Sequence, residues 1–232
     1  MFSRIAVAVV VLILSACGAP RPRPSAPQPA IPPAAILQSL PPPGAYTIDS
    51  RNSELRILVY RAGPLANLGH NHVMVNRDMA GLVQIGSSIS ASSFSLKVPV
   101  ESFVVDDPEA RREEGGDFPG DIPPDAKLGT RRHMLGAAVL NAAEFPVITL
   151  TSVTLTGTPD ALSAQLTISV AGHETNISAP CTLQGDEHRL TAAGSMELRQ
   201  TAIGLAPYSL LHGALQVEDA MQLKFSIVVP IS

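Results

Sequence analysis

Two histidines that lie two residues apart form the most chemically suggestive pattern in the chain, His70 and His72 within the run GHNH. On a β-strand, side chains at this spacing point to the same face, so both imidazoles could bind one divalent cation. Such a site needs a third or fourth ligand, for which His133 and His212 are the candidates. The alternative interpretation is that His70 and His72 make structural hydrogen bonds at the rim of a barrel or contact a lipid head group.

Patterns typical of catalysis are missing from the sequence. It contains no nucleophile elbow, no metalloprotease helix and no phosphate-binding loop. Cys181 has no base in the same run, and it alternates with apolar residues, which indicates a small buried hydrophobic side chain. We therefore expect a protein that is not an enzyme and that needs no catalytic cofactor.

The amino terminus has the pattern of an export signal. Arg4 precedes the apolar run Ile5–Leu14, whose ten residues are too few to span a membrane and match the core of a signal peptide. The run ends in LSACG, which is typical of a bacterial lipoprotein signal, so residues 1–16 would be removed and Cys17 would carry the lipid. In a cell with two membranes, Gly18 after that cysteine favours the outer membrane, facing the periplasm, because a retention signal would carry Asp there. An ordinary secretory signal is the alternative.

Residues 17–44 are rich in proline and predict an extended spacer between the anchor and a folded domain at residues 45–232. The formal net charge is −4, and no basic stripe with interleaved aromatic residues occurs, so we expect no binding to nucleic acid.

From residue 45 onward the chain alternates apolar and polar residues in about nine short runs. This period is typical of half-buried strands and predicts an all-β antiparallel barrel of about eight strands. A barrel of that size can hold one small ligand. Several residues that we expect to point inward are small, which leaves room for a cavity; they are Ala179, Ala192 and Gly194.

One short helix is predicted between the strands. Good helix-forming residues follow Thr130, the expected N-cap, and Pro146 should end the helix near Glu144 or Phe145. A helix this short must cover something, and we expect it to cover one end of the barrel.

The segment before that helix, Asp106–Lys127, is rich in charge, Gly and Pro and predicts a solvated loop. The alternative interpretation is a calcium site made by four carboxylates of this segment, those of Asp106, Asp107, Asp117 and Asp121. Their spacing is not the regular spacing of a known calcium-binding loop.

The order of these motifs resembles the YceI-like family of lipocalin-like, polyisoprenoid-binding proteins. The resemblance covers about Tyr46–Pro230 and rests on the opening YTID, on the helix-to-strand junction Arg131–Leu150 with its R-x-x-M-L and F-P-x-I-T patterns, and on Arg199 before Gly204. It implies an extended eight-stranded barrel with a helix over one end. It also implies a long apolar channel for an isoprenoid, a quinone or a similar lipid, bound without chemistry.

These considerations give the expected ligand-binding residues, which are His70, His72, Ala179, Ala192, Gly194, Met196 and Phe225. The expected partners are an apolar lipid ligand and the membrane that holds the anchor, and a homodimer remains an open alternative. The competing function is that of a metal-binding accessory protein that uses His70 and His72.

Overall fold

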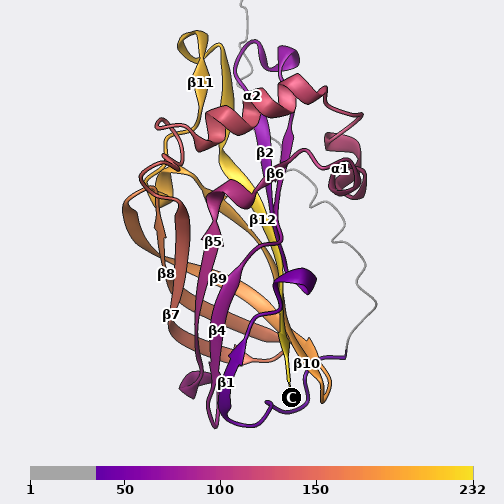
Figure 1. Ribbon diagram of the computed structural model, residues 1–232, viewed down its shortest axis with the longest axis vertical. Coiled ribbons are helices and arrows are strands. Elements are labelled where there is room, and N and C mark those ends of the chain that lie inside the picture. Colours follow the sequence, from indigo (N-terminus) through magenta and orange to yellow (C-terminus); the bar gives the residue numbers. More distant parts are fainter. Residues whose placement is uncertain (1–34, 232) are drawn as a thin grey trace, which may run out of the picture.

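One antiparallel sheet, curled along its length, accounts for most of the chain in the computed structural model, which describes residues 35–231 (Figure 1). Within these residues the sheet has twelve strands in the order β1-β4-β5-β7-β8-β9-β10-β12-β2-β3-β6, with β11 paired to β12. The strands are β1 Gly44–Thr47, β2 Glu54–Ala62, β3 His72–Asn76, β4 Ala80–Ile85, β5 Ser93–Pro99, β6 Val104–Val105, β7 Val147–Thr158, β8 Ala161–Val170, β9 His173–Gly185, β10 Arg189–Arg199, β11 Ser209–Leu210 and β12 Leu215–Pro230.

The all-β antiparallel prediction is confirmed, although the strands outnumber the expected eight. Three of the additional strands are short (β1, β6 and β11), whereas the long strands β7 to β10 and β12 follow one another as neighbours. Single hydrogen bonds outside the strand ladders connect the residues after β1 to β12, and β3 to β5. Asp49 N donates to Val228 O over 2.9 Å, and Asn76 Nδ2 donates to Pro99 O over 2.9 Å.

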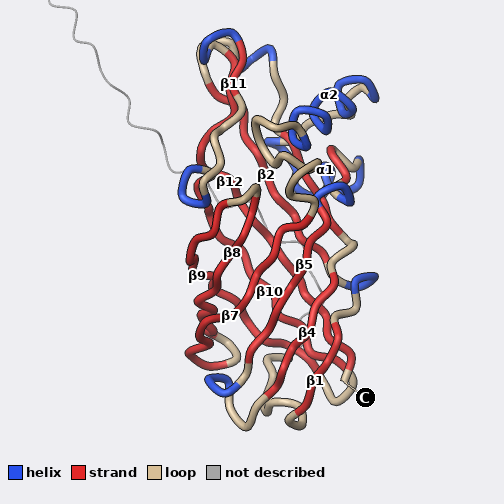
Figure 2. The backbone as a smooth tube through the Cα atoms, turned by 60° about the vertical axis from the view of Figure 1, so that its left-hand side comes forward, coloured by secondary structure: helices blue, strands red, loops and turns tan. Residues whose placement is uncertain are grey.

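Alternation along the strands divides the sheet into an inner and an outer face. On β2, Leu55, Ile57 and Val59 point inward, and Arg56 and Leu58 point outward. The tube view shows the strands coiling around a common interior (Figure 2). Among residues 35–231, no helix has the length and apolar character needed to cross a bilayer.

The predicted helix exists but begins and ends earlier than expected. Helix α2 spans Pro124–Leu135, so Thr130 lies in its interior and is not its N-cap. Pro124 occupies the first turn, where a proline costs no hydrogen bond, and Gly136 is the C-cap. From there to Phe145 the chain forms turns, one of them with Asn141 at φ 45°. Figure 1 shows α2 across one end of the curled sheet, close to β6.

The prediction of a solvated loop at Asp106–Lys127 is wrong, because most of this segment folds onto the outer face of the sheet. It forms helix α1, Pro108–Glu114, followed by a 3-10 turn at Gly115–Asp117. Asp107 caps α1 by accepting hydrogen bonds from the backbone N–H groups of Glu109 and Ala110, and Gly115 at φ 75° ends it.

Helix α1 closes a second hydrophobic cluster outside the barrel. Leu58, Val73 and Val75 on the outer face of the sheet pack against Ala110 and Phe118. Leu58, Val73 and Ala110 are fully buried. This apolar contact fixes the segment that precedes α2 to strands β2 and β3.

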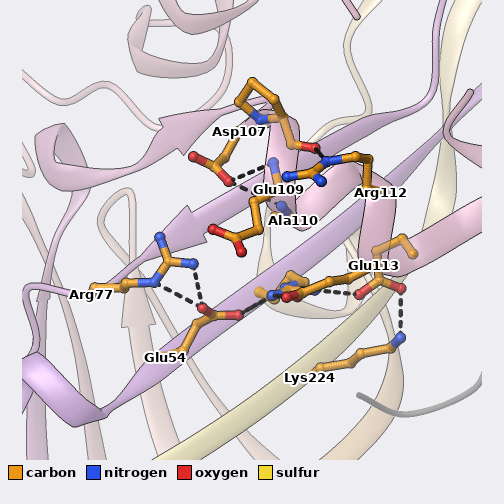
Figure 3. A network of polar contacts seen from close by, with 11 residues as sticks. Glu54, Arg77, Asp107, Glu109, Ala110, Arg112, Glu113 and Lys224 are labelled. Atoms are coloured by element: carbon orange, nitrogen blue, oxygen red, sulfur yellow. Dashed lines mark hydrogen bonds and ion pairs between the residues drawn. The ribbon is translucent and has the colours of Figure 1, made fainter. Parts of the chain in front are cut away.

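A charged network holds the other side of α1 (Figure 3). Glu114 lies between two buried cations, with Oε1 2.9 Å from Arg56 Nη1 and Oε2 2.6 Å from Lys224 Nζ. Arg56 also contacts Glu54 and Glu113, and Glu54 contacts Arg77 at the surface. The charges that suggested a solvated loop are therefore partly buried and paired.

Short 3-10 turns complete the described secondary structure: η1 Ser50–Asn52, η2 Ala66–Leu68, η3 Ile89–Ala91, η4 Val100–Ser102, η6 Thr201–Ile203 and η7 Leu211–Gly213.

The last part of the predicted spacer, residues 35–44, lies against the barrel. Leu37 is buried and donates its backbone N–H to Leu183 O over 3.0 Å, and Ile36 forms a bridge with Gln184. The predicted signal segment and Cys17 lie outside the described residues.

Candidate functional site

The inside of the curled sheet holds a cavity of about 480 Å³. Ligand pockets commonly measure about 300–1,000 Å³. The lining comes from nearly every long strand and from α2, and most of it is aliphatic. On β12 alone the lining residues run from Leu215 to Val229, roughly 45 Å of extended strand at about 3.3 Å per residue. The cavity therefore suits a long, thin, apolar molecule.

The side chains of five residues that the sequence predicted to bind ligand line this cavity: His72, Ala179, Ala192, Met196 and Phe225. His70 also lines it, in the loop before β3, so it is not a strand residue. Cys181 is half-buried between Ala179 and Leu183 on the same face of β9.

Gly194 has no room for a side chain. A Cβ placed there would lie 2.4 Å from Pro180 O and 2.5 Å from Phe225 Cζ, because the ring of Phe225, its cross-strand partner, covers it. The small size of Gly194 thus accommodates an aromatic ring and does not itself widen the cavity.

The polar residues of the lining gather at the end covered by α2. They come from the end of β2 and the loop after it, from α2, and from the segments near β11: Tyr60, Arg61, His70, His72, Thr130, His133, Gln200, Tyr208 and Gln216. At this end the ring of His133 stacks on that of Tyr208, with centroids 4.6 Å apart. Ser92 and Ser93 are the polar lining residues of the opposite half.

His72 is held by a carboxylate that the spacing of the histidines did not reveal. Its Nδ1 lies 2.7 Å from Oδ2 of Asp106, a fully buried residue with φ 55°. Oδ1 of Asp106 accepts hydrogen bonds from Val73 N over 3.0 Å and from Arg111 Nη1 over 2.7 Å. Arg111 is buried too and binds three backbone carbonyls, those of Asn71, Pro119 and Gly120.

These contacts set the ionisation of Asp106. Burial alone would raise the pKa of Asp106. Three contacts outweigh burial and hold that pKa below its usual range: the hydrogen bond and charge of His72, the Val73 N–H group, and the Arg111 guanidinium. The pKa of His70 is lowered by partial burial, then by the charges of His72 and Arg111, although the residue as a whole is exposed.

The lowered pKa of Asp106 makes a prediction for acid stability. The ionised Asp106 carboxylate should contribute fully to the free energy of unfolding above about pH 3.9, the pKa of an unfolded aspartate. That contribution should be lost as the pH falls through the lower pKa of Asp106 in the folded state. Urea unfolding measured from pH 6 to pH 2 should therefore show a steeper loss of stability in the parent than in Asp106→Asn, which cannot titrate there. Identical slopes for the two proteins would contradict the buried contacts described for Asp106.

A metal site is not assembled from the candidate residues. Among residues 35–231, no group of three or more His, Cys, Asp or Glu side chains is close enough together to hold a metal ion. The ring centroids of His70 and His72 are 6.3 Å apart, and His133 packs on Tyr208. The calcium alternative for Asp106 lacks support for the same reason, since that carboxylate contacts His72 and Arg111.

A curled antiparallel barrel with an apolar interior and a helix over one end defines the class of lipocalin-like proteins. The sequence profile of the YceI-like domain matches residues 46–229, and the chain belongs to that family. No curated protein matches the sequence significantly.

Solved structures share the fold at low sequence identity. Burkholderia cenocepacia BcnA matches with a TM-score of 0.57 at 14% identity, covering 78% of this chain and 98% of its own. A polyisoprenoid binding domain from Saccharophagus degradans, implicated in plant cell wall breakdown, has a TM-score of 0.53 at 12% identity, covering 81% and 98%. The Campylobacter jejuni YCEI protein has a TM-score of 0.52 at 10% identity, covering 68% and 84%.

Proposed function

We propose that this protein binds a long apolar ligand, such as an isoprenoid, a quinone or a similar lipid, inside the barrel and carries it without chemical change. The observation that supports this most strongly is the long cavity of about 480 Å³ with its mostly aliphatic wall. Burying apolar surface there is favourable by about 25 cal/mol per Å², and a lipid chain has such surface along its whole length. Membership of the YceI-like family agrees with this role, as does the structural similarity to a polyisoprenoid binding domain.

The contacts of His72 fit the binding and carrying of a ligand better than catalysis. His72 with Asp106 resembles the histidine–carboxylate pair that enzymes use as a general base. Such a pair acts through a nucleophile or a water next to the free imidazole nitrogen. Among the described residues, no serine, threonine or cysteine makes a hydrogen bond with His72. We therefore assign the pair to positioning and binding.

Cys181 offers a direct test of occupancy. Burial raises the pKa of the Cys181 thiol to about 11, so little thiolate is present at pH 8 and labelling should be slow. Because Cys181 lines the cavity, adding farnesol should slow its reaction with an apolar maleimide at least fivefold. The measurement uses a Cys17→Ser background, so that Cys181 is the remaining thiol. An unchanged rate at saturating farnesol would argue against a ligand in the cavity.

We further propose that the protein is a lipoprotein of the bacterial cell envelope, anchored through Cys17 to the outer membrane and facing the periplasm. The support is the sequence pattern of residues 1–18, and acylation at one cysteine supplies the several chains that stable anchoring needs. The Cys17→Ser variant should accumulate as unprocessed precursor or leave the membrane fraction. If fractionation finds it processed and as firmly membrane-bound as the parent, the anchor proposal is wrong.

A further inference from the structure

The two ends of the cavity differ in charge as well as polarity. Among the lining residues of the described chain, Arg61 is the one side chain that is charged at all physiological pH values, and no aspartate or glutamate lines the cavity at all. Three histidines, His70, His72 and His133, line it at the same end. A ligand head group at this end therefore meets potential cations and no carboxylate.

His72 presents one nitrogen to this end of the cavity. Its Nδ1 is engaged by Asp106, and no protein partner of its Nε2 is found among residues 35–231. The ring lines the cavity, and its side chain is 16% exposed. A carboxylate on Nδ1 fixes the orientation of the ring, so Nε2 faces the cavity, and a protonated ring can donate from Nε2 to an anion.

Asp106 itself does not repel such an anion. It is fully buried behind His72, and the guanidinium of Arg111 lies 2.7 Å from its Oδ1. Arg111 and Asp106 thus form a neutral pair. A proton on His72 would then be an added positive charge on the cavity side.

Arg61 is placed next to the histidines by the loop that carries them. Its Nη1 donates to Gly69 O over 2.6 Å, and its backbone N–H donates to Asn71 Oδ1 over 3.0 Å. Asn71 in turn donates from Nδ2 to Asp117 O over 2.8 Å, which ties this loop to the segment after α1. The remaining guanidinium N–H groups have no protein acceptor within the described chain, and Arg61 is an exposed residue of the cavity lining.

We infer that the ligand is an amphiphile with an acidic head group, a carboxylate or a phosphate, bound with that group at the α2 end between Arg61 and His72. The inference rests on the proposed lipid-binding function and specifies its ligand class. Hydrogen bonds between a cation and an anion are roughly twice as strong as neutral ones, and they strengthen where the surroundings are apolar. A neutral head group such as an alcohol would gain less from the same side chains.

The test compares ligands that share a chain and differ in the head group. Isothermal titration calorimetry below the critical micelle concentration would use hexadecanoic acid against hexadecan-1-ol, and farnesyl monophosphate against farnesol. We expect one acid to bind at least tenfold more tightly than its alcohol. The pair with the larger preference identifies the head group as carboxylate or phosphate.

Variants then assign the preference to named groups. His72→Asn keeps an amide donor for Asp106 but lacks Nε2, and Arg61→Gln keeps a polar side chain without the charge. Each should reduce the preference for the acid at least fivefold while leaving alcohol binding within twofold. The control is His188→Gln, a histidine whose side chain is 83% exposed in the turn between β9 and β10, and it should behave as the parent. Arg61→Gln provides the test alone if His72→Asn does not fold.

Failure of this inference is distinguishable from failure of the proposed function. Acids and alcohols that bind equally well would overturn the acidic head group and leave the apolar cavity as a binding site. A preference for the acid that survives in both variants would also overturn the assignment to Arg61 and His72. No binding of any of the four compounds would overturn the proposed function and this inference together.

Discussion

Glu114→Gln should lower the free energy of unfolding by about 3 kcal/mol, because removing one partner of a buried ion pair leaves the other charges uncompensated. Arg56, Glu114 and Lys224 are all at least nine-tenths buried. Lys224 contacts Glu114 over 2.6 Å, and no other carboxylate contacts Lys224 in the described chain. Urea unfolding followed by circular dichroism at pH 7 measures the change.

The neighbouring residue supplies the control. Glu113 lies on the same helix and contacts the same Arg56, but its side chain is 44% exposed. Exposed ion pairs contribute about 0–1 kcal/mol, so Glu113→Gln should cost less than about 1 kcal/mol. Equal losses for the two variants would contradict the packing of α1 on the outer face of the sheet.

Ala192→Phe should weaken ligand binding at least tenfold and change stability little. Ala192 lines the cavity on β10 opposite Ile227, so a phenyl ring there would extend into space that a ligand needs. In a packed core an added ring of this kind costs about 1–3 kcal/mol, whereas an existing cavity should reduce that cost to less than about 1 kcal/mol. We expect at least a tenfold weaker affinity for farnesol by calorimetry, together with a melting temperature close to that of the parent.

Ala161→Phe is the matched control, since Ala161 is exposed at the start of β8 and is not a lining residue. It should bind farnesol as the parent does. Gly194 is unsuitable for this test because its Cβ position is filled by Pro180 O and the ring of Phe225. If Ala192→Phe binds normally but loses several kcal/mol of stability, the barrel interior is packed and not hollow.

The barrel could be predicted from the sequence because a period of two residues directly reports which face of a strand is buried. Leu55, Ile57 and Val59 alternate in the sequence and line the interior. The same rule placed Ala192 inward. It could not show that Gly194 lies beneath an aromatic ring, because that depends on the register between β10 and β12.

Helix α1 was missed because charge, Gly and Pro are typical of loops as well as of helix ends. A local signal was present, namely Asp107 as N-cap, Pro108 in the first turn and Gly115 after the last. The burial of its charges depends on Arg56 and Lys224, which are far away in sequence. No spacing rule reveals such partners.

The sequence does not reveal the end of helix α2, because several alanines after Gly136 favour helix and mask the stop signal of that glycine.

The histidine pair shows a related limit. The spacing of His70 and His72 indicated a shared environment, and both line the cavity. The contact between His72 and Asp106 spans 34 residues and arises from the pairing of β3 with β6. The sequence therefore indicated where a polar site lies but not which atoms it offers.

The most direct test of the account is mass spectrometry of what the barrel carries. The full-length protein would be purified from cells, extracted with chloroform and methanol, and compared with Ala192→Phe prepared in parallel. We expect one class of long-chain lipid in near-equimolar amount in the parent and a reduction of at least tenfold in the variant. Parent protein that yields no lipid, or the same lipids in the same amounts from both proteins, would contradict it.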